Sequence, residues 1–223
     1  MRRDRARLRG LYAITPASTD TAGLVRRVVE CLEGGAALIQ YRAKDVQPGL
    51  ALIQARALLE VCRQASVPLI VNDSIELAAA VGADGVHLGR DDAGVREARI
   101  LMPGALVGVS CYDDPERARA AARDGADYVG IGSMFPSTTK PGAVHASLEM
   151  LAQARRASGL PVAAIGGITA DNAATVVAAG ADMLAIISAV FDAADVRRTA
   201  RSIASHFDPP RGTPDERSQP QPV

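Results

Sequence analysis

The feature that most limits what this chain can fold into is a rhythm of short apolar runs separated by longer segments of helical period. Each run is rich in Val, Ile, Leu or Tyr and has the length of a buried strand. Successive runs start roughly 15 to 33 residues apart, which leaves room for a strand, a loop and a helix in each interval. The eight runs are LYAIT at Leu11, ALIQYR at Ala37, PLIVN at Pro68, GVHLG at Gly85, LVGVS at Leu106, YVGIG at Tyr128, PVAAIGG at Pro161 and MLAIIS at Met183.

Nearly continuous apolar strands are typical of a parallel sheet that is covered by helices. Eight strand–helix units therefore predict an α/β protein with a closed (β/α)8 architecture, a TIM barrel. A doubly wound open sheet is the alternative. It would usually contain fewer strands, and no Gly-rich dinucleotide fingerprint follows the first run.

Helix ends are marked along the chain by a repeated triplet. Gly-Ala-Asp occurs at Gly82, Gly125 and Gly180, each time between a helical segment and an apolar run. We interpret the glycine as a helix C-cap that leads directly into a parallel strand. Asp73 and Ser74 are candidate N-caps for the helix IELAAAVG, which Gly82 would end.

The domain organisation follows from the same pattern. We predict a single barrel domain over residues 11–207, preceded by an Arg-rich segment over residues 1–10. Residues 208–223 read DPPRGTPDERSQPQPV and contain too few apolar residues to offset the entropy of ordering. This last segment is predicted to be a disordered tail.

Composition excludes several classes of partner. Lys plus Arg and Asp plus Glu are 25 each, and a zero net charge argues against a nucleic-acid-binding protein. With four Tyr, three Phe and no Trp, a base-stacking surface is not expected. No apolar run approaches the roughly 20 residues of a membrane-spanning helix. The sequence does not fix the oligomeric state, and a homo-oligomer is compatible with it.

The cellular compartment of the protein is predicted from its cysteines and its N-terminal segment. Cys31, Cys62 and Cys111 lie far apart without paired spacing, so neither a zinc site nor a disulfide framework is expected. Residues 1–10 have no apolar region behind the arginines and do not resemble a signal peptide. We therefore expect a cytoplasmic protein with reduced thiols.

Chemistry is expected where the strands end, because parallel barrels carry their active sites at the carboxyl ends of their strands. The second run ends Gln40-Tyr41-Arg42-Ala43-Lys44, and alternation places Gln40, Arg42 and Lys44 on one side. An amide and two cations that converge in this way suit a polyphosphate group. The competing interpretation is a solvated strand end with surface ion pairs.

Acidic residues follow the next two runs. The third ends Asn72-Asp73, and the fourth is followed by Asp91 and Asp92. Two carboxylates with an amide oxygen suit a hard cation such as Mg²⁺, which also binds substrate phosphate oxygens. The competing interpretation makes these aspartates helix N-caps. His87 lies within the fourth run, where we expect a packed or hydrogen-bonded histidine.

Hydroxyl groups and a lysine follow the fifth and sixth runs. Ser110 ends the fifth run, where it suits a phosphate contact or, alternatively, a cap of the next helix. The loop after the sixth run contains Ser137, Thr139 and Lys140 between prolines, a composition suited to closing over an anion. The competing interpretation is a polar surface loop.

The last two runs end in small and hydroxyl residues. Gly166-Gly167 follows the seventh run, and Ile187-Ser188 follows the eighth. Glycine permits close approach of backbone N–H groups to a phosphate, and barrels often bind phosphate in these two loops. Together the residues predict one cationic site with a metal, suited to a diphosphate, and one backbone site, suited to a monophosphate.

Taken together, these strand ends resemble the thiamine phosphate synthase family. The matching segments run from Leu11 to about Ala189 and are LYAIT, GGAALIQYRAKD, VNDSIELAAAVGADGVHLGRDD, GVS, GADYVGIGSMFPSTTK, AIGGIT and AIISA. The resemblance implies a transferase of thiamine biosynthesis. It would couple hydroxymethylpyrimidine diphosphate to hydroxyethylthiazole phosphate, giving thiamine phosphate and diphosphate, with Mg²⁺ as cofactor.

The resemblance also implies roles for individual residues. The pyrimidine diphosphate would be held by Gln40, Arg42, Lys44 and Asn72. Mg²⁺ would be bound by Asp73 and Asp92. The diphosphate would be contacted or covered by Ser110, Ser137, Thr139 and Lys140, with Arg42, Lys44 and Lys140 serving catalysis. The thiazole phosphate would be seated by Gly167, Ile187 and Ser188.

Two departures from the family pattern stand out. Ser137 replaces the first Thr of the family's Pro-Thr-x-Thr-Lys loop, which keeps a hydroxyl, and Tyr112 stands where the family often has His. A thiazole tautomerase on the same fold, as an alternative, is expected to need that His. An inactive phosphate-binding barrel and another phosphate-handling barrel, such as an epimerase or aldolase-type enzyme, are further alternatives.

Overall fold

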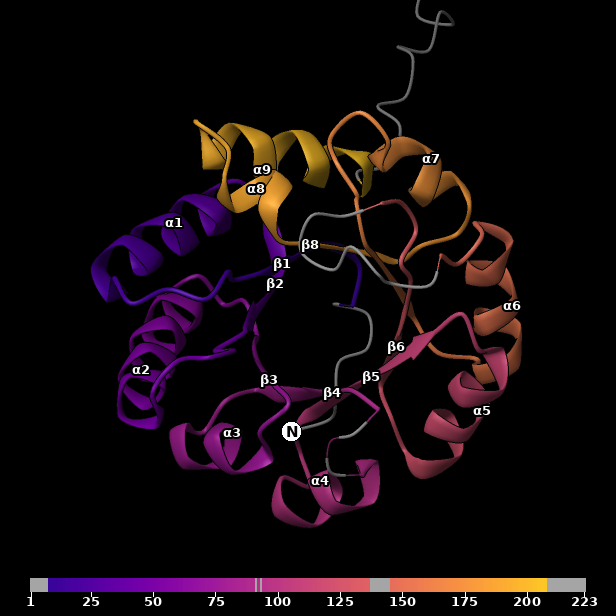
Figure 1. Ribbon diagram of the computed structural model, residues 1–223, viewed down its shortest axis with the longest axis horizontal. Coiled ribbons are helices and arrows are strands. Elements are labelled where there is room, and N and C mark those ends of the chain that lie inside the picture. Colours follow the sequence, from indigo (N-terminus) through magenta and orange to yellow (C-terminus); the bar gives the residue numbers. More distant parts are fainter. Residues whose placement is uncertain (1–7, 91, 93, 137–144, 208–223) are drawn as a thin grey trace, which may run out of the picture.

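The protein is a closed barrel of eight parallel strands surrounded by helices, as predicted. The computed structural model describes residues 8–90, 92, 94–136 and 145–207. The strands pair in sequence order, β1-β2-β3-β4-β5-β6-β7-β8, and β8 closes onto β1. Figure 1 looks along the barrel and shows the helices as an outer ring around the strands.

The strands coincide closely with the eight apolar runs. They are β1 (Gly10–Ile14), β2 (Ala36–Tyr41), β3 (Leu69–Asn72), β4 (Gly85–Leu88), β5 (Leu106–Tyr112), β6 (Tyr128–Ile131), β7 (Val162–Ile165) and β8 (Met183–Ile186). The helices are α1 (Thr21–Glu33), α2 (Pro48–Gln64), α3 (Ile75–Val81), α4 (Val95–Leu101), α5 (Pro115–Asp124), α6 (Glu149–Ser158), α7 (Ala173–Ala178), α8 (Ser188–Phe191) and α9 (Val196–Ala204). A 3-10 turn, η2 (Ser205–Phe207), follows α9.

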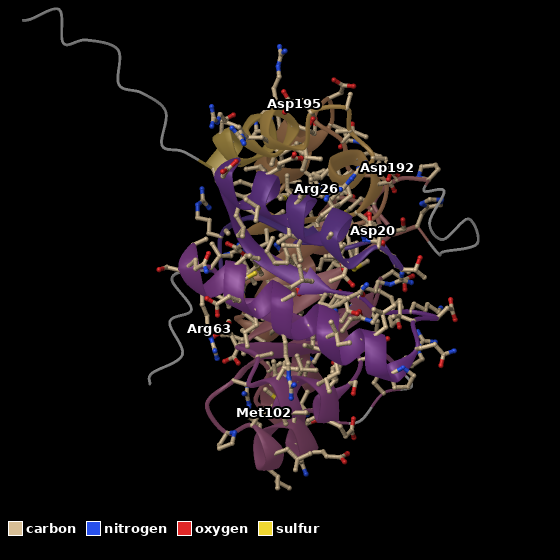
Figure 2. All side chains as sticks on the ribbon, turned by 90° about the vertical axis from the view of Figure 1, so that its left-hand side faces the viewer. Asp20, Arg26, Arg63, Met102, Asp192 and Asp195 are labelled. Atoms are coloured by element: carbon tan, nitrogen blue, oxygen red, sulfur yellow. The ribbon has the colours of Figure 1, made fainter. Side chains whose placement is uncertain are left out.

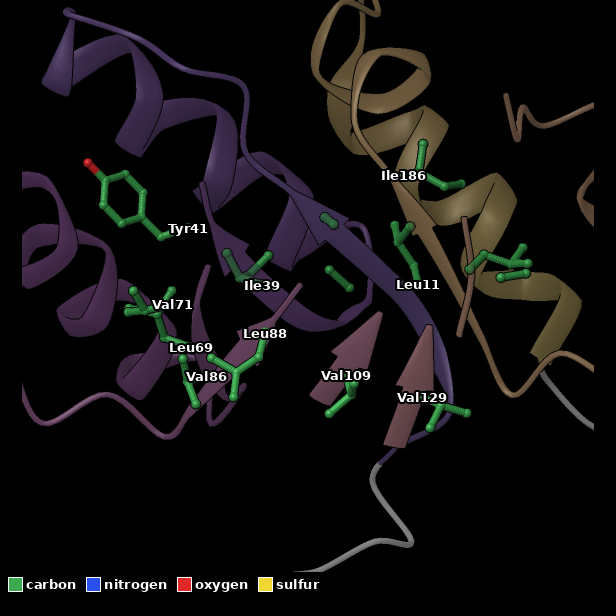
Figure 3. Close-up of a cluster of buried hydrophobic side chains, with 14 of the residues drawn as sticks. Leu11, Ile39, Tyr41, Leu69, Val71, Val86, Leu88, Val109, Val129 and Ile186 are labelled. Carbon is green, nitrogen blue, oxygen red and sulfur yellow. The ribbon is translucent and has the colours of Figure 1, made fainter. Parts of the chain in front are cut away.

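Alternation along the strands produces two separate cores. Residues such as Leu11, Ile39 and Val86 point outward and pack under the helices in the larger cluster, part of which is shown in Figure 3. The smaller cluster fills the barrel itself and includes Leu8, Tyr12, Leu38, Ile70, Tyr128 and Met183. Side chains at the inward positions therefore either fill the barrel or line its mouth.

The three Gly-Ala-Asp triplets form a repeated link, which we call the Gly-Ala-Asp clamp. In each, the Asp carboxylate accepts a hydrogen bond from the backbone N–H of the first or second residue of the preceding strand. The bonds are Leu69 N to Asp84 at 2.9 Å, Val107 N to Asp127 at 2.9 Å and Val162 N to Asp182 at 2.8 Å. An arginine of the neighbouring helix donates to each Gly carbonyl: Arg63 to Gly82, Arg99 to Gly125 and Arg155 to Gly180.

The clamps lie at the end of the barrel where the strands begin. Figure 2 views the molecule from the side and shows Arg63 at the opposite end from Asp20 and Asp192, which follow the carboxyl ends of β1 and β8. Arg9, just before β1, and Phe207, in η2, also meet at the clamp end, where the Arg9 guanidinium lies 5.5 Å from the centre of the Phe207 ring. Among the described residues, no helix is both long and apolar enough to cross a membrane.

Candidate active site

Polar side chains gather on the inward face where β2, β3 and β5 end. Gln40 is paired with Ile70, Asn72 with His87, and Ser110 with Gly130 in the strand register. Gln40 is only 2% exposed, whereas Asn72 and Ser110 are half-buried. The predicted grouping of these three side chains at the mouth is consistent with this register, because they occupy inward positions near the carboxyl ends of their strands.

Helix capping does not account for Asp73, Asp92 or Ser110. The N-cap of α3 is Ser74, whose hydroxyl accepts from Leu77 N at 3.1 Å. The N-cap of α4 is Gly94. The N-cap of α5 is Asp114, which accepts from two backbone N–H groups. The capping interpretation is therefore wrong for all three candidates, because the N-cap of each helix is another residue.

The end of β2 is held against the end of β1 by Thr15. Thr15 N donates to the Gln40 carbonyl at 2.9 Å, and the Thr15 hydroxyl accepts from Arg42 N at 3.0 Å. Tyr41 points the other way, into the helix layer, and donates to Gln54 Oε1 at 2.8 Å. The backbone thus leaves the strand in a fixed direction, with Arg42 half-buried and Lys44 exposed beyond it.

The two candidate metal ligands follow neighbouring strands. Asp73 has a φ of 65° and donates its N–H to the His87 carbonyl at 2.8 Å, so that its backbone is tied to β4. Asp92 accepts from Gly89 N at 2.5 Å and thereby folds the loop after β4 back onto the strand end. Asp91 lies outside the described residues.

The donor chemistry of these residues fits Mg²⁺. Asp73 and Asp92 supply carboxylate oxygens and Asn72 an amide oxygen, and Mg²⁺ usually takes one or two carboxylates plus substrate phosphates and water. Within the described part of the chain, no group of three or more His, Cys, Asp or Glu side chains is placed to hold a metal alone. Water and substrate oxygens are the further ligands that Mg²⁺ usually takes beside such carboxylates.

The loop between β6 and α6 begins at a fixed point. Met134 N donates to the Ile165 carbonyl at 2.9 Å and Phe135 N to the Gly166 carbonyl at 3.0 Å. Gly167, with a φ of 61°, could not carry a side chain, since a Cβ would lie 2.5 Å from the Pro136 carbonyl oxygen. Contact with this loop is thus one reason for glycine there. Ser137, Thr139 and Lys140 lie outside the described residues.

The remaining predicted residues lie after β8. Ile187 is half-buried against the barrel interior and precedes α8, and Ser188 is the first residue of that helix. Ile187 and Ser188 follow β8, and Gly167 follows the neighbouring strand β7. The structure therefore places the three residues predicted to hold the thiazole phosphate just after two adjacent strands.

Sequence reasoning did not identify a polar core beneath the mouth. Tyr12 and Tyr128 are buried inside the barrel, and their hydroxyls lie 2.6 Å apart. Gln40 Nε2 donates to the Tyr12 hydroxyl at 2.6 Å, and His87 bonds both Tyr128 and Ser110. Burial raises the pKa of both phenols, that of Tyr128 well above its ordinary value, so that both stay protonated.

Tyr112 lies at the end of β5 between two arginines. The Arg90 guanidinium is 4.7 Å and that of Arg117 is 5.8 Å from the centre of its ring, distances suited to cation–π contacts. Arg117 also donates to the carbonyls of Ser110 and Gly89, which joins the ends of β4 and β5. The residue that replaces the family His therefore takes part in bracing this side of the mouth.

Comparison with known proteins gives a consistent result. The sequence model of the family described as thiamine monophosphate synthase matches residues 11–190. A thiamine-phosphate synthase of Aromatoleum aromaticum is 54% identical over 203 residues, covering 91% of this chain and 98% of the relative. That of Thiobacillus denitrificans is 53% identical over 199 residues, covering 89% and 94%.

Solved structures agree with this assignment. Thiamine phosphate pyrophosphorylase from Pyrococcus furiosus superimposes with a TM-score of 0.81 at 37% identity, covering 91% of this chain and 96% of that one. A 3-hexulose-6-phosphate synthase, with a TM-score of 0.68 and 19% identity over 89% of this chain and all of the other (100%), shares the fold. By its sequence over most of the barrel and by its relatives, this chain belongs to the thiamine monophosphate synthase family.

Proposed function

We propose that this protein is a thiamine-phosphate synthase. It couples hydroxymethylpyrimidine diphosphate to hydroxyethylthiazole phosphate and releases thiamine phosphate and diphosphate. The observation that carries this proposal is the inward row of Gln40, Asn72 and Ser110 at the ends of β2, β3 and β5, in a chain of this family. The N-caps of α3 and α4 are Ser74 and Gly94, so capping does not account for Asp73 or Asp92.

The reaction needs charge stabilisation and positioning more than a base or a nucleophile. The bond between the pyrimidine methylene carbon and the diphosphate oxygen breaks first, and the leaving diphosphate takes the electron pair. The electron-rich pyrimidine stabilises the methylene cation that remains. The thiazole nitrogen then donates its lone pair to that carbon, which forms thiamine phosphate.

Cationic side chains at the end of β2 have the chemistry for the leaving group. Arg42 presents a planar fork of donors and Lys44 a mobile point charge, and both follow a strand end that Thr15 holds in place. Lys140, outside the described residues, is proposed as a third cation over the diphosphate. Gln40 and Asn72 would orient the pyrimidine diphosphate, and Ser110, Ser137 and Thr139 would donate hydroxyl hydrogen bonds to its phosphates.

Asp73 and Asp92 would hold Mg²⁺ at this site. When bound, the ion would neutralise part of the charge on the diphosphate oxygens. On the opposite side of the mouth, Gly167, Ile187 and Ser188 would seat the thiazole phosphate, because their adjacent loops follow β7 and β8. The two substrates would thereby meet over the barrel axis.

A coupling assay tests the proposal. The purified protein is mixed with both substrates, with Mg²⁺ or with EDTA, and thiamine phosphate is followed by thiochrome fluorescence. We expect product with Mg²⁺ and none with EDTA. A folded protein that makes no product under either condition would contradict the function, and equal product under both would contradict the metal role.

The site assignment is tested with a matched pair of arginine variants. Removing the Arg42 guanidinium should lower kcat/KM roughly a hundredfold, since charged hydrogen bonds contribute about 1.5–3 kcal/mol each. Arg119→Ala is the control, because Arg119 is exposed on α5 and pairs only with Glu116 among the ion pairs described for it. Equal rates for Arg42→Ala and Arg119→Ala would remove Arg42 from the site.

A further inference from the structure

Five side chains from five strands form a continuous hydrogen-bonded chain through the barrel. It runs from Gln40 Nε2 to the Tyr12 hydroxyl at 2.6 Å and on to the Tyr128 hydroxyl at 2.6 Å. The Tyr128 hydroxyl is 3.1 Å from His87 Nδ1, and His87 Nε2 is 2.9 Å from Ser110 Oγ. Both ends of the chain are residues of the proposed site, and the three between them have no assigned role.

Glycines on two strands, β5 and β6, leave room for this hydrogen-bonded chain. A Cβ on Gly108 would lie 2.1 Å from the Tyr128 ring, so any side chain there would displace the phenol. A Cβ on Gly130 would approach His87 Cε1 to 3.4 Å. The rings of Tyr12 and Tyr128 meet edge to face with centres 5.8 Å apart, which fixes the two hydroxyls toward each other. The packing of the barrel thus specifies the chain.

Counting protons gives the chain a direction. The Gln40 amide nitrogen can only donate, so the Tyr12 oxygen is an acceptor in that bond. Because the Tyr12 oxygen already accepts there, its own proton is best used on the Tyr128 oxygen, and the proton of Tyr128 then goes to His87 Nδ1. A neutral imidazole that accepts at Nδ1 carries its proton on Nε2 and donates it to Ser110 Oγ. The Ser110 proton remains for an acceptor outside the chain.

We propose that His87 is a positioning residue that, through this chain, fixes the Ser110 hydroxyl as a donor to the substrate's phosphate group. In the reverse direction the Ser110 hydroxyl would donate its proton to His87 Nε2, and it could then only accept hydrogen bonds from the substrate. A donor aimed at the leaving diphosphate is worth most as negative charge grows there. The role of the hydroxyl rests on the proposed function, whereas the direction of the chain can be measured without substrate.

The direction of the chain is tested by ¹⁵N NMR of the histidine rings in the unliganded protein. The protein has three histidines, and His87→Gln identifies the signals of His87 by their loss. We expect His87 in the Nε2–H form at neutral pH, and loss of that preference in Tyr128→Phe. Tyr41→Phe is the control, because it removes a buried phenol hydroxyl from the outward face of β2. An Nδ1–H ring in the wild type would overturn the proposal, whatever the enzyme catalyses.

The link to catalysis is tested by a double-mutant cycle. Ser110→Ala and His87→Leu should each lower kcat roughly tenfold to a hundredfold, and the double variant should be no slower than the slower single variant. His87→Gln, whose amide can donate near the position of Nε2, should recover most of the rate. Independent, multiplying losses would show that His87 does not act through Ser110.

Two safeguards keep the outcomes separate. Circular dichroism shows whether His87→Leu folds. If it does not, the link to catalysis is tested by comparing the kcat of His87→Gln with those of Tyr128→Phe and Tyr41→Phe, since each of these variants changes a single polar group. If the wild type does not couple the substrates, the proposed function fails, and the NMR result alone confirms or overturns the proton direction.

Discussion

At the scale of single residues, the chain divides its polar side chains between the fold and the mouth of the barrel. Ser74, Asp114 and Asp195 cap helices that begin near the mouth, each accepting from a backbone N–H group two or three residues ahead. A capping residue satisfies N–H groups that would otherwise lack partners. Because these residues cap the helices, neighbours such as Asp73 and Ser110 can serve chemistry without a loss of helix stability.

Cysteines contribute to stability in a way that depends on pH. Cys31, Cys62 and Cys111 are free and buried, and burial raises the pKa of each thiol from 9.0 to about 12. Between these values the unfolded chain loses protons that the folded chain keeps. The free energy of unfolding is therefore unaffected by the thiols below pH 9, and it falls above pH 9 by about 1.4 kcal/mol per pH unit for each thiol.

Urea unfolding between pH 7 and 11 measures this slope. Cys62→Ala is expected to have a shallower decline above pH 9 than the wild type, by the contribution of one thiol. Below pH 9 the free energies of unfolding of the two proteins should differ by a constant amount. Parallel curves over the whole range would show that the Cys62 thiol ionises as readily in the folded protein as in the unfolded one.

Alternation along the strands was enough to predict some residues of the mouth but not those beneath it. Gln40 occupies an inward position near the end of β2, as its spacing from Arg42 indicated, because the side-chain period of a strand is local. Tyr12 and Tyr128 are separated by 115 intervening residues and meet only when the barrel closes. Their pairing depends on the space left by Gly108, and no local pattern reports that contact.

At the scale of helices and strands, the Gly-Ala-Asp clamp is the recurring device. It joins β3 to β4, β5 to β6 and β7 to β8 at the ends where these strands begin. The glycine of the first clamp, Gly82, has a φ of 68° and ends α3 as predicted. The backbone part of the device was visible in the sequence. The carboxylate bond to the neighbouring strand was not, since it depends on strand register.

The clamps differ in burial, which predicts different contributions to stability. Asp127 is fully buried and pairs with Arg99, whose side chain is 15% exposed, whereas Asp84 is an exposed residue. Asp127→Ala would leave a largely buried guanidinium without its carboxylate and should lower the free energy of unfolding by about 3–5 kcal/mol. Asp84→Ala should cost about 1 kcal/mol, the value of one hydrogen bond.

Urea denaturation of the two variants makes the comparison. Asp127→Asn serves as an intermediate control, because an amide oxygen can still accept from Val107 N while the charge is removed. Similar losses for Asp127→Ala and Asp84→Ala would show that burial of the ion pair does not set the strength of the clamp.

At the scale of the whole molecule, the two ends of the barrel have different tasks. The clamps and their arginines tie the strands together where they begin, and the residues of the proposed site follow the strands where they end. The fold was predictable because every strand pairs with its neighbours in sequence and each crossover repeats the same unit. The loop residues proposed to contact the substrates are not fixed by that repeat, since loops vary independently of the barrel.

Contact between Arg9 and Phe207 has a consequence for how the barrel can be built. Since the chain enters and leaves the barrel side by side, the position of its break is arbitrary for the closed sheet. A circular permutant that joins Val223 to Met1 and opens the chain after Gly104, an exposed residue between α4 and β5, keeps every residue and every strand pair. We expect it to fold and to couple both substrates at a rate near that of the parent. An unfolded permutant would contradict this expectation and would show that the connection between α4 and β5 is required to close this barrel.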